Sequence, residues 1–135
     1  MRFQKKVWCA LSIFIWACSS TVRAEIPKKL TEPQAYKLLR GLYGNLHGGF
    51  FDYSPDVDKI FYAYQGIGRP GTEGGFGFFS VNPWTGDVWA LWGCYKLKMP
   101  ELRAAKAEIR RRFTAAELKQ YDRLSRLKPD CIVED

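Results

Sequence analysis

Histidine is nearly absent from this sequence, and the spacings that mark common catalytic sites are missing as well. His47 is the only histidine among 135 residues. A Ser-His-Asp or Cys-His mechanism would have to use it, yet no Gly-x-Ser-x-Gly nucleophile motif accompanies it. We therefore expect His47 to be a loop residue and the protein not to be an enzyme. A small hydrolase that pairs His47 with an aspartate of residues 52–58 is the last of three functional alternatives.

Cysteine is scarce, with four residues in the chain. No Cys-x-x-Cys spacing occurs, and the two cysteines of the predicted mature domain together with His47 fall short of the four ligands of a structural zinc site. Cys9 and Cys18 precede the predicted start of the mature domain, which leaves Cys94 and Cys131. In an oxidising compartment this pair is expected to form a disulfide, which would stabilise the fold by about 3–4 kcal/mol. Two separate buried thiols are the alternative.

Long apolar runs are also missing. The uncharged, mainly apolar stretch of residues 7–18 is too short for a bilayer, since a transmembrane helix needs about 20 residues. It follows the positive charges of residues 2–6 and precedes a short segment with small residues at the expected cleavage site after Ala24. This order is typical of a signal peptide. Residues 1–24 are therefore predicted to be a secretory signal peptide, and residues 25–135 a single small domain that is periplasmic or secreted.

Two alternatives remain for this leader. It would be a short membrane anchor if it were not cleaved, and a lipid anchor at Cys18 would follow if the residues before that cysteine acted as a lipoprotein signal. The ordinary cleavage site after Ala24 fits the sequence better than either, because a tryptophan stands at a position where such lipoprotein signals have small residues.

Most of the net charge of +7 belongs to the leader. Four of the 21 Lys and Arg residues lie within residues 1–24, which leaves 17 against 14 Asp and Glu, a net charge of +3. The remaining cations concentrate in residues 101–128, where Arg110, Arg111 and Arg112 are consecutive. A basic helical face of this kind is usually a solvated surface. The small net charge and the predicted export argue against nucleic acid as a partner.

Two motifs suggest cofactor or metal sites, but their context does not support either. Residues 66–71 match Gly-x-Gly-x-x-Gly, yet a dinucleotide site needs a helix directly after the glycines, whereas here another strand is predicted. Asp52, Asp56 and Asp58 lack the glycine and the distal glutamate of a calcium loop, so we expect turn formers and caps. We predict neither a cofactor nor a metal.

The hydrophobic spacing predicts an α+β fold. In chain order the expected elements are a helix from Thr31 to Gly44, a loop at 46–58, strands at 59–65, 76–81 and 88–92, and one or two helices between Pro100 and Pro129. Thr31 with Gln34, and Thr114 with Glu117, have the spacing of capping boxes. The prediction is an N-terminal helix, a three-stranded antiparallel meander, one or two C-terminal helices and one disulfide.

Aromatic residues are the strongest positive signal, at 16% of the chain. A domain of this size cannot bury all of them, so part of the sheet is predicted to expose rings that contact a protein or stack on sugars. The candidate binding residues are Trp84, Trp89, Trp92, Tyr62 and Tyr64. Among them Trp84 is expected to be exposed at the tip of a turn. Complete coverage of this sheet face by a helix is the alternative.

The stretch from Phe79 to Trp89 contains Asn82-Pro83-Trp84-Thr85-Gly86-Asp87 and resembles the hairpin of PepSY-type domains. The resemblance covers about eleven residues, a length over which turn chemistry alone can produce a match. It implies a non-catalytic exported module that restrains a peptidase or binds at the cell envelope. It transfers no functional residue.

Three functions remain in order of preference. The first is an exported, non-catalytic inhibitor or immunity-type protein that binds a protein partner in the envelope through an aromatic sheet surface. The second is a module that binds cell-wall glycan, peptidoglycan above all, through the same surface. The hydrolase that uses His47 is the third.

Overall fold

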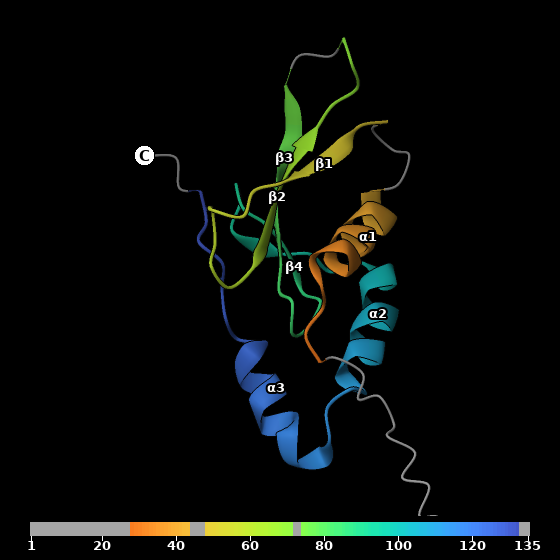
Figure 1. The fold of residues 1–135 in the computed structure, drawn as a ribbon, viewed down its shortest axis with the longest axis vertical. Coiled ribbons are helices and arrows are strands. Elements are labelled where there is room, and N and C mark those ends of the chain that lie inside the picture. The colour runs from red at the N-terminus through yellow and green to blue at the C-terminus, as the bar shows by residue number, and fades with distance from the viewer. Residues whose placement is uncertain (1–27, 44–47, 72–73, 133–135) are drawn as a thin grey trace, which may run out of the picture.

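In the computed structural model, which describes residues 28–43, 48–71 and 74–132, one antiparallel sheet packs against helices (Figure 1). The elements in chain order are α1 (Glu32–Tyr43), β1 (Phe50–Tyr53), β2 (Tyr62–Ile67), β3 (Gly75–Val81), β4 (Val88–Ala90), β5 (Tyr95–Lys96), α2 (Pro100–Arg110), the 3-10 turn η1 (Ala115–Glu117) and α3 (Leu118–Leu124). The strands lie in the sheet in their chain order, each antiparallel to the next. The α+β prediction is confirmed.

The two faces of the sheet are covered differently. Figure 1 shows α1 and α2 on one side and the C-terminal segment on the other. Toward the helices, alternate strand residues such as Tyr64 and Val81 form the main core with Leu39 of α1 and Ile109 of α2. The opposite face carries a second, smaller cluster. It consists of Phe61, Trp89 and Leu91, with Phe78 and Ile132 packed against it.

The sheet has five strands within the described residues, so the predicted count of three was wrong. Strand β1 falls inside the stretch predicted to be a loop. It was missed because only Phe51 of its four residues is buried, so the strand has no alternation of apolar and polar residues. Strand β5 has two residues, too few for any periodic signal. Both are edge strands, which pair on one side only and are often short.

Strand β2 begins later than predicted because Asp58 forms a capped turn before it. The Oδ1 atom of Asp58 accepts hydrogen bonds from the backbone N–H groups of Ile60 at 2.7 Å and Phe61 at 2.9 Å. Ile60 falls within the strand predicted at 59–65, but it lies before β2 and is 53% exposed.

A β-bulge places an extra aromatic ring on the helical face. Gly66 pairs with Gly77 and the next residue pairs with Gly75, so Phe76 has no partner of its own. Phe76 therefore packs on the same face as Phe79, with ring centroids 6.3 Å apart. Its ring also covers Gly66, where a Cβ atom would approach to 2.7 Å. The glycine at this position allows the close approach.

The C-terminal helices begin as the sequence predicted. The backbone N–H and the hydroxyl of Thr114 both donate to Glu117 Oε2 at 2.9 Å, which completes a capping box. Hydrogen bonds from Lys28 and from Thr114 hold the pKa of Glu117 at about 2. Helix α3 ends at Leu124, five residues before the predicted stop at Pro129.

This early end of α3 has a tertiary cause. Side chains from two other segments bind carbonyl groups at the end of the helix. Asn82 Nδ2, from the turn between β3 and β4, donates to the oxygen of Leu124 at 2.8 Å, and Lys96 Nζ, from β5, donates to that of Ser125 at 3.0 Å. From there residues 126–132, the C-terminal tail, run back along the sheet.

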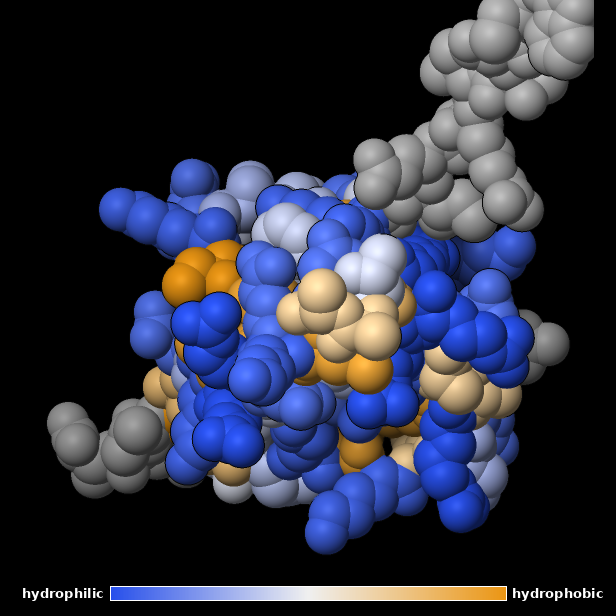
Figure 2. All heavy atoms as spheres, turned by 90° about the horizontal axis from the view of Figure 1, so that it is seen from below, coloured by the Kyte–Doolittle hydropathy of each residue, from blue (hydrophilic) through white to orange (hydrophobic). Residues whose placement is uncertain are grey.

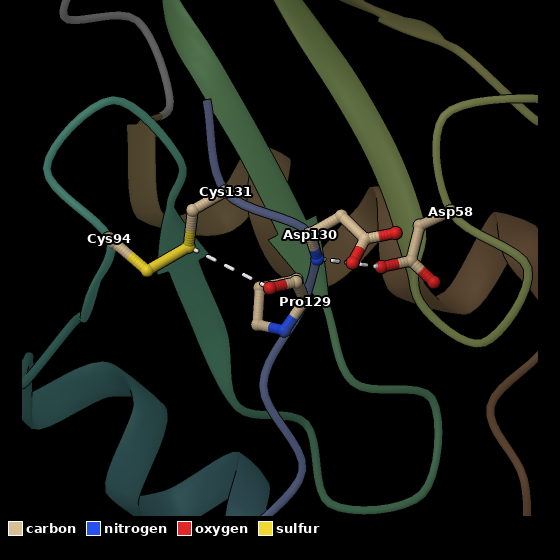
Figure 3. Close-up of a disulfide and its surroundings, with 5 residues drawn as sticks. All are labelled: Asp58, Cys94, Pro129, Asp130 and Cys131. Carbon is tan, nitrogen blue, oxygen red and sulfur yellow. Dashed lines mark hydrogen bonds between the residues drawn. A yellow bond between two sulfur atoms is a disulfide. The ribbon is translucent and has the colours of Figure 1, made fainter. Parts of the chain in front are cut away.

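The predicted disulfide between Cys94 and Cys131 is confirmed. Figure 3 shows it beside Pro129 and Asp130, where the tail passes the strands. Among the helices of the described residues, none has the length and the apolar character of a membrane span.

Candidate functional site

Two of the five predicted binding aromatics lie in the core. Tyr64 is 1% exposed, and its hydroxyl donates to the backbone oxygen of Glu32 at 3.2 Å and to the carboxylate of Glu32 at 3.1 Å. Burial is the main cause of its raised pKa. Trp89 is 7% exposed and belongs to the smaller cluster. Both rings are buried in the hydrophobic clusters of the fold, so neither belongs to an exposed surface.

Two others are partly covered. The ammonium of Lys29 lies 5.7 Å from the ring centroids of both Tyr62 and Trp84. The hydroxyl of Tyr62 donates to the backbone oxygen of Leu30 at 3.0 Å. Trp84 was expected to be exposed at the tip of its turn, but it is only partly accessible. These two rings hold the chain that enters α1 against the sheet.

The fifth predicted residue, Trp92, is exposed. It is 57% accessible and lies in the connection between β4 and β5. We call residues 91–95, which are this connection and the first residue of β5, the Trp92 turn. Its ring meets Phe78 edge-on at a centroid distance of 5.6 Å. Tyr95, at the other end of the turn, is 56% exposed. The turn thus presents two large rings that have only partial packing partners.

Several contacts fix the Trp92 turn in place. The disulfide joins its Cys94 to the tail, and Cys94 adopts a positive φ of 48°. The backbone of Leu91 donates to the oxygen of Phe78 at 2.9 Å and accepts from Ile132 N–H at 3.2 Å. A loop held this way loses little conformational freedom when a partner binds, which favours affinity.

The acidic loop has a structural role at Asp58. Beside its two capping bonds, Asp58 Oδ2 accepts from the backbone N–H of Asp130 at 3.3 Å, which links this loop to the tail (Figure 3). Asp52 and Asp56 are exposed. No cluster of three potential metal ligands occurs among the described residues. His47 lies outside the described residues, so the hydrolase alternative stays untested.

The turn between β3 and β4 buries a polar network that the sequence did not reveal. Asn82 Oδ1 accepts from the N–H groups of Trp84 at 2.9 Å and Thr85 at 3.3 Å. Asp87, 1% exposed, accepts from the hydroxyl of Thr85 at 2.9 Å. Its carboxylate also pairs with Lys96, at 3.0 Å, and with Lys106. The turn residues themselves were visible in the sequence, but the two lysines come from other elements.

The end of the molecule near α3 is mainly hydrophilic, with small apolar areas between charged side chains (Figure 2). Within the basic segment, Arg111 pairs with Glu108 at 2.8 Å, and the guanidinium of Arg110 lies 5.8 Å from the ring of Tyr121. These contacts fit the predicted solvated helical face.

Comparisons with known proteins add one finding. No family model matches this chain, and no curated protein matches it. A chain from the solved structure of a type VI secretion system effector-immunity complex from Pseudomonas protegens is similar, with a TM-score of 0.51 and 26% identity. The alignment covers 75% of this chain and 93% of that chain.

Proposed function

We propose that this protein is an immunity-type protein that binds and neutralises a protein effector. One observation carries the proposal: the similarity to a chain of an effector-immunity complex extends over nearly all of that chain. The two members of such a complex bind each other, so the likeness supports a protein as the partner. The glycan-binding alternative gains no support from it.

The arrangement of polar groups fits a binder better than an effector. The two side chains with the largest pKa shifts have structural roles: Glu117 lies in a capping box and Tyr64 in the core. Asp58 and Asp87 likewise hold turns and tail together. A binder needs only a surface complementary to its partner, and the exposed rings of the Trp92 turn are the surface that we propose.

The proposal includes export to the periplasm. It is supported by the leader of residues 1–24 and by the disulfide between Cys94 and Cys131, since such bonds persist in oxidising compartments. An immunity protein must share the compartment in which its effector acts. The effector that we propose as partner is therefore one that acts in the envelope.

Trp92 is the proposed anchor of the contact. Tryptophan is enriched among the residues that dominate binding energy, and Trp92 is the most exposed large hydrophobic side chain among those described. The Phe78 ring beside it and the disulfide behind it keep it in place.

The test uses the full chain in oxidised form and the effector encoded beside its gene. We expect the chain to restore growth of cells that export this effector, and Trp92→Ala to weaken the complex by about 30-fold, the loss of about 2 kcal/mol typical of a central tryptophan. Ile60→Ala, at a 53% exposed side chain before β2, is the matched control and should change affinity by less than about threefold.

Two results would overturn the proposal. One is the absence of any complex between wild-type protein and effector by calorimetry. The other is growth inhibition by this chain alone when it is exported, because the chain would then be the effector of such a pair.

A further inference from the structure

A groove lined by basic residues lies between β5 and α2, next to the Trp92 turn. Seven residues line it: Lys96, Leu97, Lys98, Met99, Leu102, Arg103 and Lys106. Its volume is about 500 Å³. We call it the basic groove. Tyr95 of the Trp92 turn and Lys96 of the groove are the two residues of β5, so the two surfaces meet at this edge of the sheet.

The charge of the basic groove is only partly compensated. Its four cations face one buried carboxylate, that of Asp87, which holds the ammonium groups of Lys96 and Lys106. Lys98 and Arg103 are exposed, and neither makes an ion pair with a described residue. The groove therefore has an excess of positive charge and two side chains available to an incoming anion.

The inner surface of the basic groove is apolar. Leu102 is 2% exposed and belongs to the main core, and Leu97 and Met99 pack against the same core. A methionine side chain adapts to ligands of different shape. This combination suits a segment that offers carboxylates at its sides and an apolar side chain in the middle.

We propose that the basic groove binds an acidic segment of the partner protein, one that carries carboxylates around at least one apolar side chain. The proposal rests on the proposed function, whose partner is a protein. It adds a second contact surface to the Trp92 turn and states the chemistry of the partner there.

Three features favour an acidic polypeptide over other polyanions. Lys96 and Lys106 already hold a carboxylate, so the local geometry accepts that group. The lining contains no aromatic ring on which a nucleic-acid base would stack. The apolar residues lie inside a concave groove, whereas a surface that binds lipid projects its apolar side chains into the membrane.

The test replaces the two available cations in the full oxidised chain. The probes are short peptides selected by display from sequences that combine Asp and Glu with Leu and Phe, with a second library containing Asn and Gln in place of the acids. We expect acidic peptides to be enriched. The double substitution Lys98→Glu with Arg103→Glu should weaken the binding of these peptides by about tenfold or more, since two attractive contacts become repulsive. A matched control carries Lys119→Glu with Arg126→Glu, at two exposed residues of α3 and the tail.

Each outcome decides one question. Three results would overturn the acidic-segment proposal. The first is equal enrichment of the neutral library, and the second is an equal loss of binding in the control variant. The third is tighter binding to single-stranded DNA or to phosphatidylglycerol vesicles than to the peptides.

Effector neutralisation is measured in parallel. If wild type neutralises the effector and the groove variant does so equally well, the groove proposal fails and the proposed function stands. If acidic peptides bind but the effector does not, the proposed function fails alone.

Discussion

Asp87 shows how a single buried residue organises the region beside the proposed contacts. Its carboxylate is 1% exposed and receives the hydroxyl of Thr85, the ammonium of Lys96 and that of Lys106. A buried carboxylate without such partners would be costly, so these three partners stabilise the fold around Asp87. It also fixes the positions of two of the four cations of the basic groove.

Asp87→Asn should therefore destabilise the protein. The amide keeps the shape but removes the negative charge that balances two lysines, and we expect the free energy of unfolding to fall by about 2–3 kcal/mol, since both lysines are partly exposed and regain some solvation. Urea denaturation at neutral pH measures this. Asp122→Asn, at an exposed side chain of α3, should change it by less than about 0.5 kcal/mol. Equal effects of both substitutions would refute the assigned role.

At the level of elements, the turn between β3 and β4 depends on one glycine. Gly86 has a positive φ of 71°, and a Cβ atom there would lie 2.5 Å from the Cδ1 atom of Ile109 in α2. Both the backbone conformation and the close contact with the helix thus require glycine. By contrast, Gly41 lies in α1, and a Cβ atom at that position would point into open space, with no contact within 4 Å.

Alanine at these two glycines should act in opposite directions. Gly86→Ala is expected to lower the free energy of unfolding by about 1–3 kcal/mol through strain and overpacking. Gly41→Ala should raise it by about 0.5–1 kcal/mol, because alanine favours the helix and reduces the freedom of the unfolded chain. Thermal unfolding followed by circular dichroism distinguishes the two, and a stabilising Gly86→Ala would show that the turn tolerates a side chain.

At the scale of the whole molecule, the disulfide holds the C-terminal tail over the second hydrophobic cluster. Ile132 packs against that cluster and bonds to the backbone of Leu91, while Asp58 binds the tail at Asp130. The tail thus takes the place that a helix would have on this sheet face. The disulfide also fixes the Trp92 turn, so the stability of the fold and the proposed contact surface depend on the same bond.

Replacing both Cys94 and Cys131 by serine should lower the free energy of unfolding by about 3–4 kcal/mol, the value for closing a loop of this length. The indole of Trp89 should become accessible as the tail leaves, which fluorescence quenching by iodide would detect. Reduced wild-type protein is the control and should behave like the double variant. Unchanged quenching in both would show that the tail stays in place without the bond.

The sequence by itself determined the local features of this protein. The capping box at Thr114, the turn at residues 82–87 and the α+β class depend on neighbouring residues, whose spacing is visible in the chain. The pairing of Cys94 with Cys131 followed because no other cysteines remain in the predicted mature domain.

Only the tertiary structure decided which side chains are available to a partner. The sequence offered five aromatic candidates and favoured Trp84 as the exposed one, yet packing against α1 and the tail buries Tyr64 and Trp89 and leaves Trp92 exposed. The edge strands β1 and β5 and the lysines at Asp87 likewise depend on contacts between distant segments. Exposure and charge pairing arise from how elements pack, and residue spacing along the chain does not contain that information.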